Sequence, residues 1–147
     1  MVETVRQRDV WEVFQAISDA KPRSKKVEIL KAHQNDMHVR DVLQGTFDPN
    51  INWNLPEGIP PYTPQQDGPP PPSSLLKQHV NFKYFVKGLK LSEELATVRR
   101  ERMFIDILEA IHPKDAAILV SMVNKKKPEF DGLTEKLVKE ALPDLIP

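Results

Sequence analysis

Prolines are concentrated in one stretch of this 147-residue chain, and that stretch divides it. Nine of the 14 prolines lie within residues 49–72, which also contain Gly58 and Gly68 and carry very few charges. Because proline fixes φ and lacks a backbone donor, the stretch is not helical and favours extended polyproline backbone through PPYTP and GPPPP. The sequence therefore predicts one domain over residues 1–147, in which residues 49–74 form a stiff connector between residues 1–48 and 75–147.

Two interpretations of this connector remain open. Alternating apolar residues are costly to leave in water, which favours an ordered strap that lays them on the helices. These residues are Ile51, Trp53, Leu55, Ile59 and Tyr62. Alternatively, Pro61 and Pro64 have the PxxP spacing that binds aromatic-lined grooves, which makes Pro61, Tyr62 and Pro64 the candidate protein-binding residues.

Three short helices are expected before the connector. The first runs from about Asp9 to Ala20 on an apolar stripe that recurs at steps of three and four residues. The stripe consists of Val10, Val13, Phe14 and Ile17. Ser24 is the expected N-cap of a second helix with Lys25, Lys26 and Lys31 pointing away from its apolar face, and a third runs from about residue 35 to 47.

Four helices are expected after the connector. Ser73 or Ser74 caps one that continues through Val86 to a left-handed Gly88, and Ser92 caps a longer one that ends near Ile111. The stripe expected to be buried on that longer helix consists of Leu95, Val98, Phe104, Ile105, Leu108 and Ile111. Pro113 starts the next helix, and Thr134 starts the last.

No segment outside the connector has the period of a strand, so the predicted class is all-α, with about six or seven short helices and the connector between the third and fourth.

The chain has no Cys, which excludes disulfides, thiolate metal sites and thiol catalysis and fits a reducing compartment. No apolar run approaches the roughly 20 residues of a membrane span, and the N-terminus lacks the apolar stretch of a secretory signal. We therefore expect no membrane association.

Catalytic patterns are also missing from the sequence. The four histidines, His33, His38, His79 and His112, form no HExxH motif, and the five glycines form neither GxGxxG nor GxxxxGK. Asp131-Gly132 is expected to form a turn. We expect no catalytic residues, no metal, no cofactor and no small-molecule substrate, and hence no enzyme activity.

Charge is balanced overall, with 21 basic and 21 acidic residues, but it is unevenly distributed. The net charges of residues 1–48, 49–74, 75–127 and 128–147 are 0, −2, +5 and −3. The basic segment contains Arg99, Arg100 and the run Lys125 to Lys127, and a smaller basic group surrounds Arg23, Lys25 and Lys26. Such a distribution permits weak, salt-dependent contact with the phosphates of duplex DNA, although ordinary solvated faces would look the same.

The spacing of residues 11–47, WEVFQAISDAKPRSKKVEILKAHQNDMHVRDVLQGTF, resembles the opening of the ATP-dependent DNA ligases of T-even-type bacteriophages. The run from Leu91 to Val123, followed by GLTEKLVKEALPDLIP, resembles the end of the same N-terminal helical domain. The chain is also similar to small proteins of tailed phages that infect marine bacteria. The resemblance implies an all-helical domain that contacts DNA phosphates, without the nucleotidyltransferase domain that follows it in a ligase.

By position, the resemblance adds Arg23, Lys25, Lys26, Lys125, Lys126 and Lys127 as candidate phosphate contacts, beside Arg99 and Arg100 from the basic segment. The expected function is therefore a non-catalytic phage accessory protein that binds duplex DNA weakly and without sequence preference. The alternative is a protein–protein interaction module or virion component that binds a phage or host protein. Either would act in the cytoplasm of the infected bacterium or in the virion. Convergence of these cations on one concave face would favour DNA, and scattering would favour the interaction module.

Overall fold

Three helices precede the connector in the computed structural model, which describes residues 8–147. They are α1 (Val10–Asp19), α2 (Arg23–Ala32) and α3 (Met37–Phe47). Asp9 caps α1, and its backbone N–H donates to the Glu12 carboxylate at 3.1 Å in a capping box. The apolar stripe predicted for α1 is fully buried. The absence of a secretory signal was expected partly from residues 1–7, which lie outside the described range.

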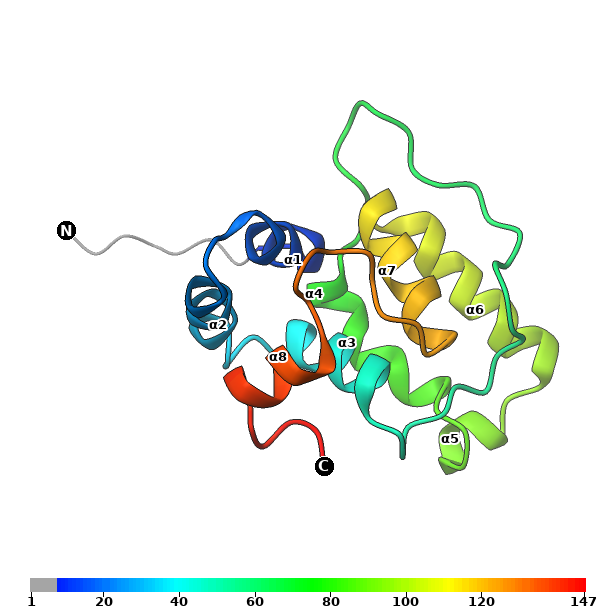
Figure 1. The fold of residues 1–147 in the computed structure, drawn as a ribbon. Helices are drawn as coiled ribbons and strands as arrows, with labels where there is room; N and C mark the ends of the chain where they lie inside the picture. The colour runs from blue at the N-terminus through cyan, green and yellow to red at the C-terminus, as the bar shows by residue number, and fades with distance from the viewer. Residues whose placement is uncertain (1–7) are drawn as a thin grey trace.

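Six further helical elements follow the connector. They are α4 (Leu75–Gln78), the 3-10 helix η1 (His79–Tyr84), α5 (Lys90–Glu93), α6 (Thr97–Ala110), α7 (Pro113–Val123) and α8 (Glu135–Ala141). Residues 8–147 thus form an all-α domain with eight α-helices, as the sequence predicts in class (Figure 1). Pro113 is the first residue of α7, and the Thr134 hydroxyl caps α8 by accepting from the N–H of Leu137 at 3.2 Å.

Two predicted helices are each divided in the structure. The helix expected from Ser73 or Ser74 to Val86 is α4 followed by η1, and the tighter 3-10 turn buries Phe82 and leaves Val80 55% exposed. Ser92 does not cap α6; it lies buried in α5, and the chain is extended at Ala96 before α6 begins. The division rotates α6, so the predicted core residue Val98 is 79% exposed and Ile107 is buried instead.

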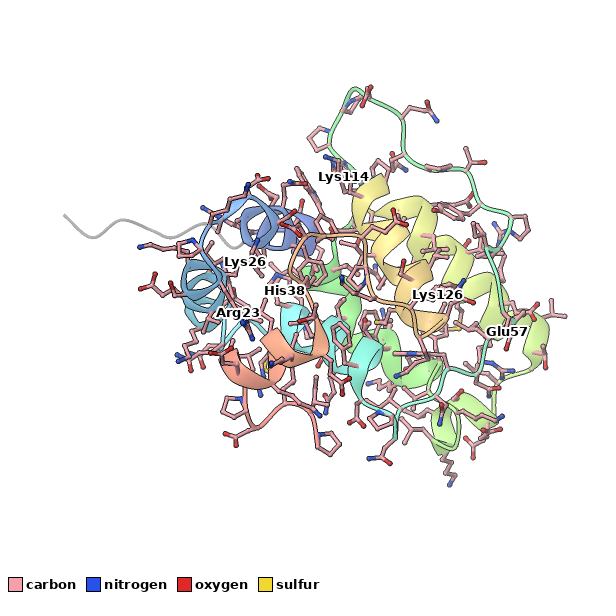
Figure 2. All side chains as sticks on the ribbon, viewed as in Figure 1. Arg23, Lys26, His38, Glu57, Lys114 and Lys126 are labelled. Carbon is pink, nitrogen blue, oxygen red and sulfur yellow. The ribbon has the colours of Figure 1, made fainter. Side chains whose placement is uncertain are left out.

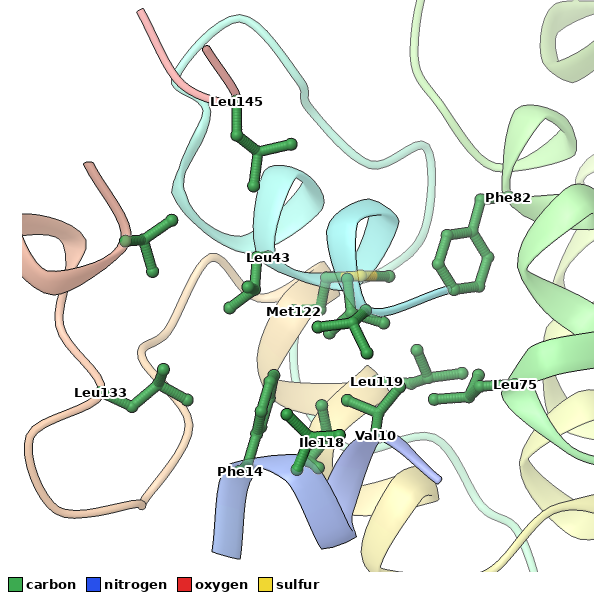
Figure 3. Packing of buried hydrophobic residues seen from close by; sticks show 14 of the residues in the cluster. Val10, Phe14, Leu43, Leu75, Phe82, Ile118, Leu119, Met122, Leu133 and Leu145 are labelled. Carbon is green, nitrogen blue, oxygen red and sulfur yellow. The ribbon is translucent and has the colours of Figure 1, made fainter. Parts of the chain in front are cut away.

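Figure 1 shows α1, α2 and α8 gathered at one end of the molecule and α5 and α6 at the other, with α3, α4 and α7 between them. The central helix α7 packs against α1, α3 and α6, and α2 packs against α1 and α8. Figure 3 shows Phe14, Leu43, Leu119 and Met122 meeting in the core between these helices. Leu133 and Leu145 join the same core, so the end of the chain closes it.

The connector crosses the surface and is attached to the helices by some of its apolar residues. Trp53 is buried, and its indole N–H donates to the carbonyl of Gly45 at 3.0 Å. Ile51, Leu55 and Tyr62 are half-buried against the core, but Ile59 is 80% exposed, contrary to the expectation that all five residues lie on the helices. No helix within residues 8–147 is long and apolar enough to cross a membrane.

Candidate functional site: the anchored connector

The backbone of the first half of the connector is held by the side chains of Arg100 and Asn124, in addition to backbone bonds between residues 52–54 and 85–87. The guanidinium of Arg100 in α6 donates to the carbonyl of Asn54 at 2.6 Å. The side chain of Asn124, at the end of α7, accepts from the N–H of Gly58 at 2.8 Å and donates to its carbonyl at 3.0 Å. Because backbone groups of Asn54 and Gly58 are held in addition to the side chain of Trp53, the helices fix the path of this half of the connector.

The second half of the connector is held at both ends by the last turn of α6. The Glu109 carboxylate accepts from the N–H of Thr63 at 2.8 Å, and the Glu109 carbonyl accepts from the amide of Gln65. Eight residues later, the N–H of Ser73 donates to the carbonyl of Ala110 at 2.9 Å. The two ends of the segment therefore attach to neighbouring residues of one helix.

Between these attachments, residues 66–72 form what we call the arch, which carries the sequence QDGPPPP. Within residues 8–147, no hydrogen bond joins positions 67–72 to the helices, and all of these positions except the half-buried Pro71 are exposed. A hollow of about 390 Å³ separates the arch from Glu109. Figure 1 shows this green segment standing away from the helices at the top of the molecule.

The predicted protein-binding residues Pro61, Tyr62 and Pro64 precede the arch, and both prolines are exposed. Tyr62 is half-buried against the core, and burial raises the pKa of its phenol. Pro61 lines a cleft of about 210 Å³ beside Phe104 of α6. Pro64 lines the hollow beside the arch, whereas Pro61 lines the cleft, and protein binding by these residues stays a prediction.

The eight predicted phosphate-binding residues are distributed very differently from the expectation. Lys26 is 8% exposed, and its ammonium donates to the carbonyls of Ile17 at 2.8 Å, Ser18 at 3.1 Å and Asp131 at 3.4 Å. It also lies 3.7 Å from the Asp131 carboxylate. The charge of Lys26 thus satisfies the C-terminal carbonyls of α1, which corrects the expectation that this side chain points away from the fold toward phosphate.

Arg100 is a second buried cation, with 7% of its surface exposed. Besides the carbonyl of Asn54, its guanidinium donates to the carbonyls of Ser92 and Leu95, each at 3.1 Å. These acceptors lie in the connector (Asn54), in α5 (Ser92) and in the break between α5 and α6 (Leu95). Arg100 therefore joins three segments of the fold, and its assignment as a phosphate contact was wrong because its donors face inward.

Lys125 is the third cation with internal partners. Its ammonium donates to the carbonyls of Gly45 at 2.8 Å and Asp48 at 2.7 Å, which lie at the C-terminal end of α3. Burial lowers the pKa of this ammonium, and the charge of Asp48 partly offsets that effect. The ammonium of Lys125 thus caps the C-terminal end of α3, and its predicted contact with phosphate stays a prediction.

The remaining predicted cations do not converge. Arg23 pairs with Glu140 at 2.6 Å and Lys25 with Glu28 at 3.4 Å, both on the surface. Arg99, Lys126 and Lys127 are exposed. Figure 2 shows Arg23 and Lys26 on the side of α2 and Lys126 across the molecule beside the end of α7. No single concave face gathers the two groups.

One groove nevertheless contains part of the predicted set. It has a volume of about 1140 Å³ and lies between the connector and the end of α7. Lys87, Lys125 and Lys126 line it together with Glu57, which Figure 2 also labels. Lys87 was part of the basic segment but was not a predicted contact, because nothing in the sequence indicates that residue 87 lies beside residue 126.

A buried carboxylate is the feature that the sequence missed. Asp115 in the first turn of α7 is 1% exposed, and its Oδ1 accepts from the N–H of Trp11 at 2.8 Å. Its Oδ2 has no hydrogen-bond partner within residues 8–147, and burial raises its pKa to about 7. The sequence indicated only an acidic residue at a helix N-terminus, since burial there depends on the packing of α1 against α7.

Within the described residues, no group of three or more His, Asp and Glu side chains is placed to hold a metal ion. His33 and His79 are each engaged with one carboxylate, Asp36 at 2.6 Å and Asp41 at 2.7 Å. The His33–Asp36 pair lies in the turn between α2 and α3, and the His79–Asp41 pair joins η1 to α3.

The fold and the connector define an all-α domain that holds a proline-rich segment on its surface. The chain belongs to the family of unknown function DUF6433, which matches residues 13–129. The matched span runs from within α1 through α7 and includes the whole connector, whereas α8 lies beyond it. No curated protein and no solved structure matches the chain.

Proposed function

We propose that this chain is a non-catalytic protein–protein interaction module of a tailed phage, acting in the infected bacterium or in the virion. The observation that carries the proposal is the arch, which is exposed and is attached at both ends to the C-terminal turn of α6. Exposed apolar proline rings bury no surface against the helices, and a partner that covers them would remove that surface from water.

The use of the basic residues supports the same proposal. Lys26, Arg100 and Lys125 bind carbonyls of the fold, and Arg23 and Lys25 are paired with carboxylates. A DNA-binding surface requires several cations directed at phosphates. Three of the eight positive charges that suggested DNA binding are therefore used to hold helices and the connector together.

Cross-linking in phage-infected cells tests this proposal. The tagged chain is compared with a variant in which residues 66–72 are replaced by a Gly/Ser segment of equal length. Since positions 67–72 make no hydrogen bonds to the helices, this replacement should leave the fold intact. A phage or host protein that cross-links to the unaltered chain and is lost with the variant supports the proposal; identical partners for both proteins contradict it.

Weak binding to duplex DNA is a second candidate function, favoured by the groove with Lys87, Lys125 and Lys126 and by the resemblance to phage ligase domains. Contacts there would be to phosphates, since lysines act as point charges without base specificity. Lys87 and Lys126 are exposed, whereas the ammonium of Lys125 is occupied by carbonyls.

Fluorescence anisotropy with nicked and intact duplexes at about 50 mM salt tests the second candidate. Binding should weaken in the Lys87→Glu/Lys126→Glu variant and should persist in a control in which the exposed Arg102, paired with Asp106 on α6, is changed to Glu. Absence of binding at this salt concentration, or equal loss in both variants, would contradict DNA binding at the groove.

A further inference from the structure

We infer that the arch is a preformed polyproline ligand, and that its partner is a protein groove lined by aromatic side chains with a basic rim. The inference rests on the proposed function and specifies the chemistry of the partner. The residues that we expect the partner to bind are therefore the tetraproline of residues 69–72, rather than Pro61 and Pro64 with their PxxP spacing.

The backbone of the arch is restricted before any partner binds. Each of the four consecutive prolines fixes its own φ near −65° and disfavours helical backbone in the residue before it. The sequence therefore favours polyproline II, the conformation that aromatic-lined grooves bind. Little backbone entropy remains to be lost when residues 69–72 enter such a groove.

The attachments of the arch reduce its freedom further. Thr63 and Gln65 are bound to Glu109, and Ser73 is bound to Ala110. A loop with both ends fixed to one helical turn samples fewer arrangements than a free peptide of the same sequence. The arch should therefore bind more tightly than that peptide.

The shape of the arch leaves Pro69, Pro70 and Pro72 exposed, whereas Pro71 is half-buried. Pro69 and Pro70 are exposed, and together with Glu109 of α6 they line the hollow of about 390 Å³. Gly68 immediately precedes them with φ +138°, a conformation that side chains rarely adopt, and no atom lies within 4 Å of where a Cβ would be. The chain thus enters the tetraproline from a backbone conformation that favours glycine.

The charge of the arch indicates which side chains should flank the partner groove. The arch contains no Lys or Arg, and its one charged residue, Asp67, is exposed next to Gly68. Glu109 lies at the base of the same hollow. An aromatic groove flanked by Lys or Arg near Asp67 is therefore complementary, whereas an acidic rim would be repelled.

The experiment titrates the full chain into isotope-labelled EVH1, SH3 and WW domains, which serve as probe grooves, and follows their aromatic side-chain signals by NMR. The test variant carries Ala at positions 69–72, and its fold is checked by thermal melting. A synthetic peptide of residues 63–73 serves as the unanchored control. Binding by at least one probe domain, weakened about tenfold or more in the Ala variant and in the peptide, is the expected result.

The possible negative results separate this inference from the proposed function. Absence of binding to every probe domain, or equal binding by the Ala variant, overturns the polyproline inference. If the Ala variant also retains the cellular cross-links that the Gly/Ser replacement loses, the arch binds a partner without using its prolines, so the proposed function survives and this inference does not. If the Gly/Ser replacement loses no cross-link, the proposed function itself fails.

Discussion

Glu109 binds Thr63 through its carboxylate, with 2.8 Å between Oε2 and the backbone nitrogen of Thr63, across 46 residues of sequence. The bond lies where the connector leaves the core and the exposed arch begins. Because the neighbouring Gln65 binds the Glu109 carbonyl, this one residue holds the start of the arch through both its side chain and its backbone. Glu109 is therefore the residue through which α6 controls the freedom of the proline-rich segment.

Replacing Glu109 with Ala should loosen the start of the arch without unfolding the domain. A hydrogen bond to a charged group contributes about 1.5–3 kcal/mol, and part of it is recovered when the Thr63 amide binds water. Hydrogen exchange at Thr63 should accelerate by about tenfold, while amides of α7 remain protected. The Asp106→Ala variant, which changes another exposed carboxylate of α6, serves as the control. Unchanged exchange at Thr63 would contradict the anchoring role.

Replacing Lys26 with Met should destabilise the domain strongly, whereas the same change at Lys25 should have little effect. Loss of the Lys26 ammonium leaves the carbonyls of Ile17 and Ser18 without that donor, at a cost of about 1–3 kcal/mol. Lys25 is exposed and makes a surface ion pair, so its change should cost less than about 0.5 kcal/mol. Urea denaturation of the two variants measures the difference, and equal stabilities would contradict the structural role of Lys26.

Stability should depend on the protonation of Asp115. Its pKa is about 7 in the folded state, against about 4 in an unfolded chain, mainly because burial disfavours the charged form. The folded state therefore binds this proton more tightly. The contribution of Asp115 to the free energy of unfolding falls as the pH rises from about 4 to 7, by on the order of 1–4 kcal/mol.

Asp115→Asn should remove this dependence. The amide oxygen can still accept from the Trp11 N–H, and the side chain cannot ionise. The variant should match the unaltered protein near pH 4 and exceed it in stability above pH 7. Denaturation curves across this range provide the measurement, with the exposed Asp106→Asn as a control. A variant less stable than the unaltered protein at pH 8 would show that the charged form is the one the fold requires.

Gly45→Ala should displace Trp53 and with it the start of the connector. A Cβ at position 45 would lie 2.5 Å from Cζ2 of Trp53 and 2.9 Å from Sδ of Met122, both of which are closer than atoms can approach. Overpacking of this kind costs about 1–3 kcal/mol. The variant should melt at a lower temperature and show altered tryptophan fluorescence. Gln44→Ala, at the neighbouring half-buried position, should preserve both properties.

Much of the helical architecture could be predicted because it depends on local signals. The stripe of α1, the proline at the start of α7, the Thr134 cap and the positive φ of Gly88 all follow from residues within a few positions of one another. The divisions at η1 and Ala96 could not be predicted in this way. At the division before α6, the carbonyls of Ser92 and Leu95 accept from the guanidinium of Arg100. Local sequence signals do not reveal this contact.

The sequence by itself determined the helical class and the position of the connector, because apolar periodicity and proline act on the local backbone. Only the tertiary structure decided which charges and which prolines of the connector are exposed to solvent. Lys26 and Lys125 look like surface residues in sequence, yet each lies beside a helix C-terminus whose carbonyls attract an ammonium. Likewise, Tyr62 is half-buried while Pro69, Pro70 and Pro72 are exposed, and Glu109 and Ala110 fix the chain on either side of the arch.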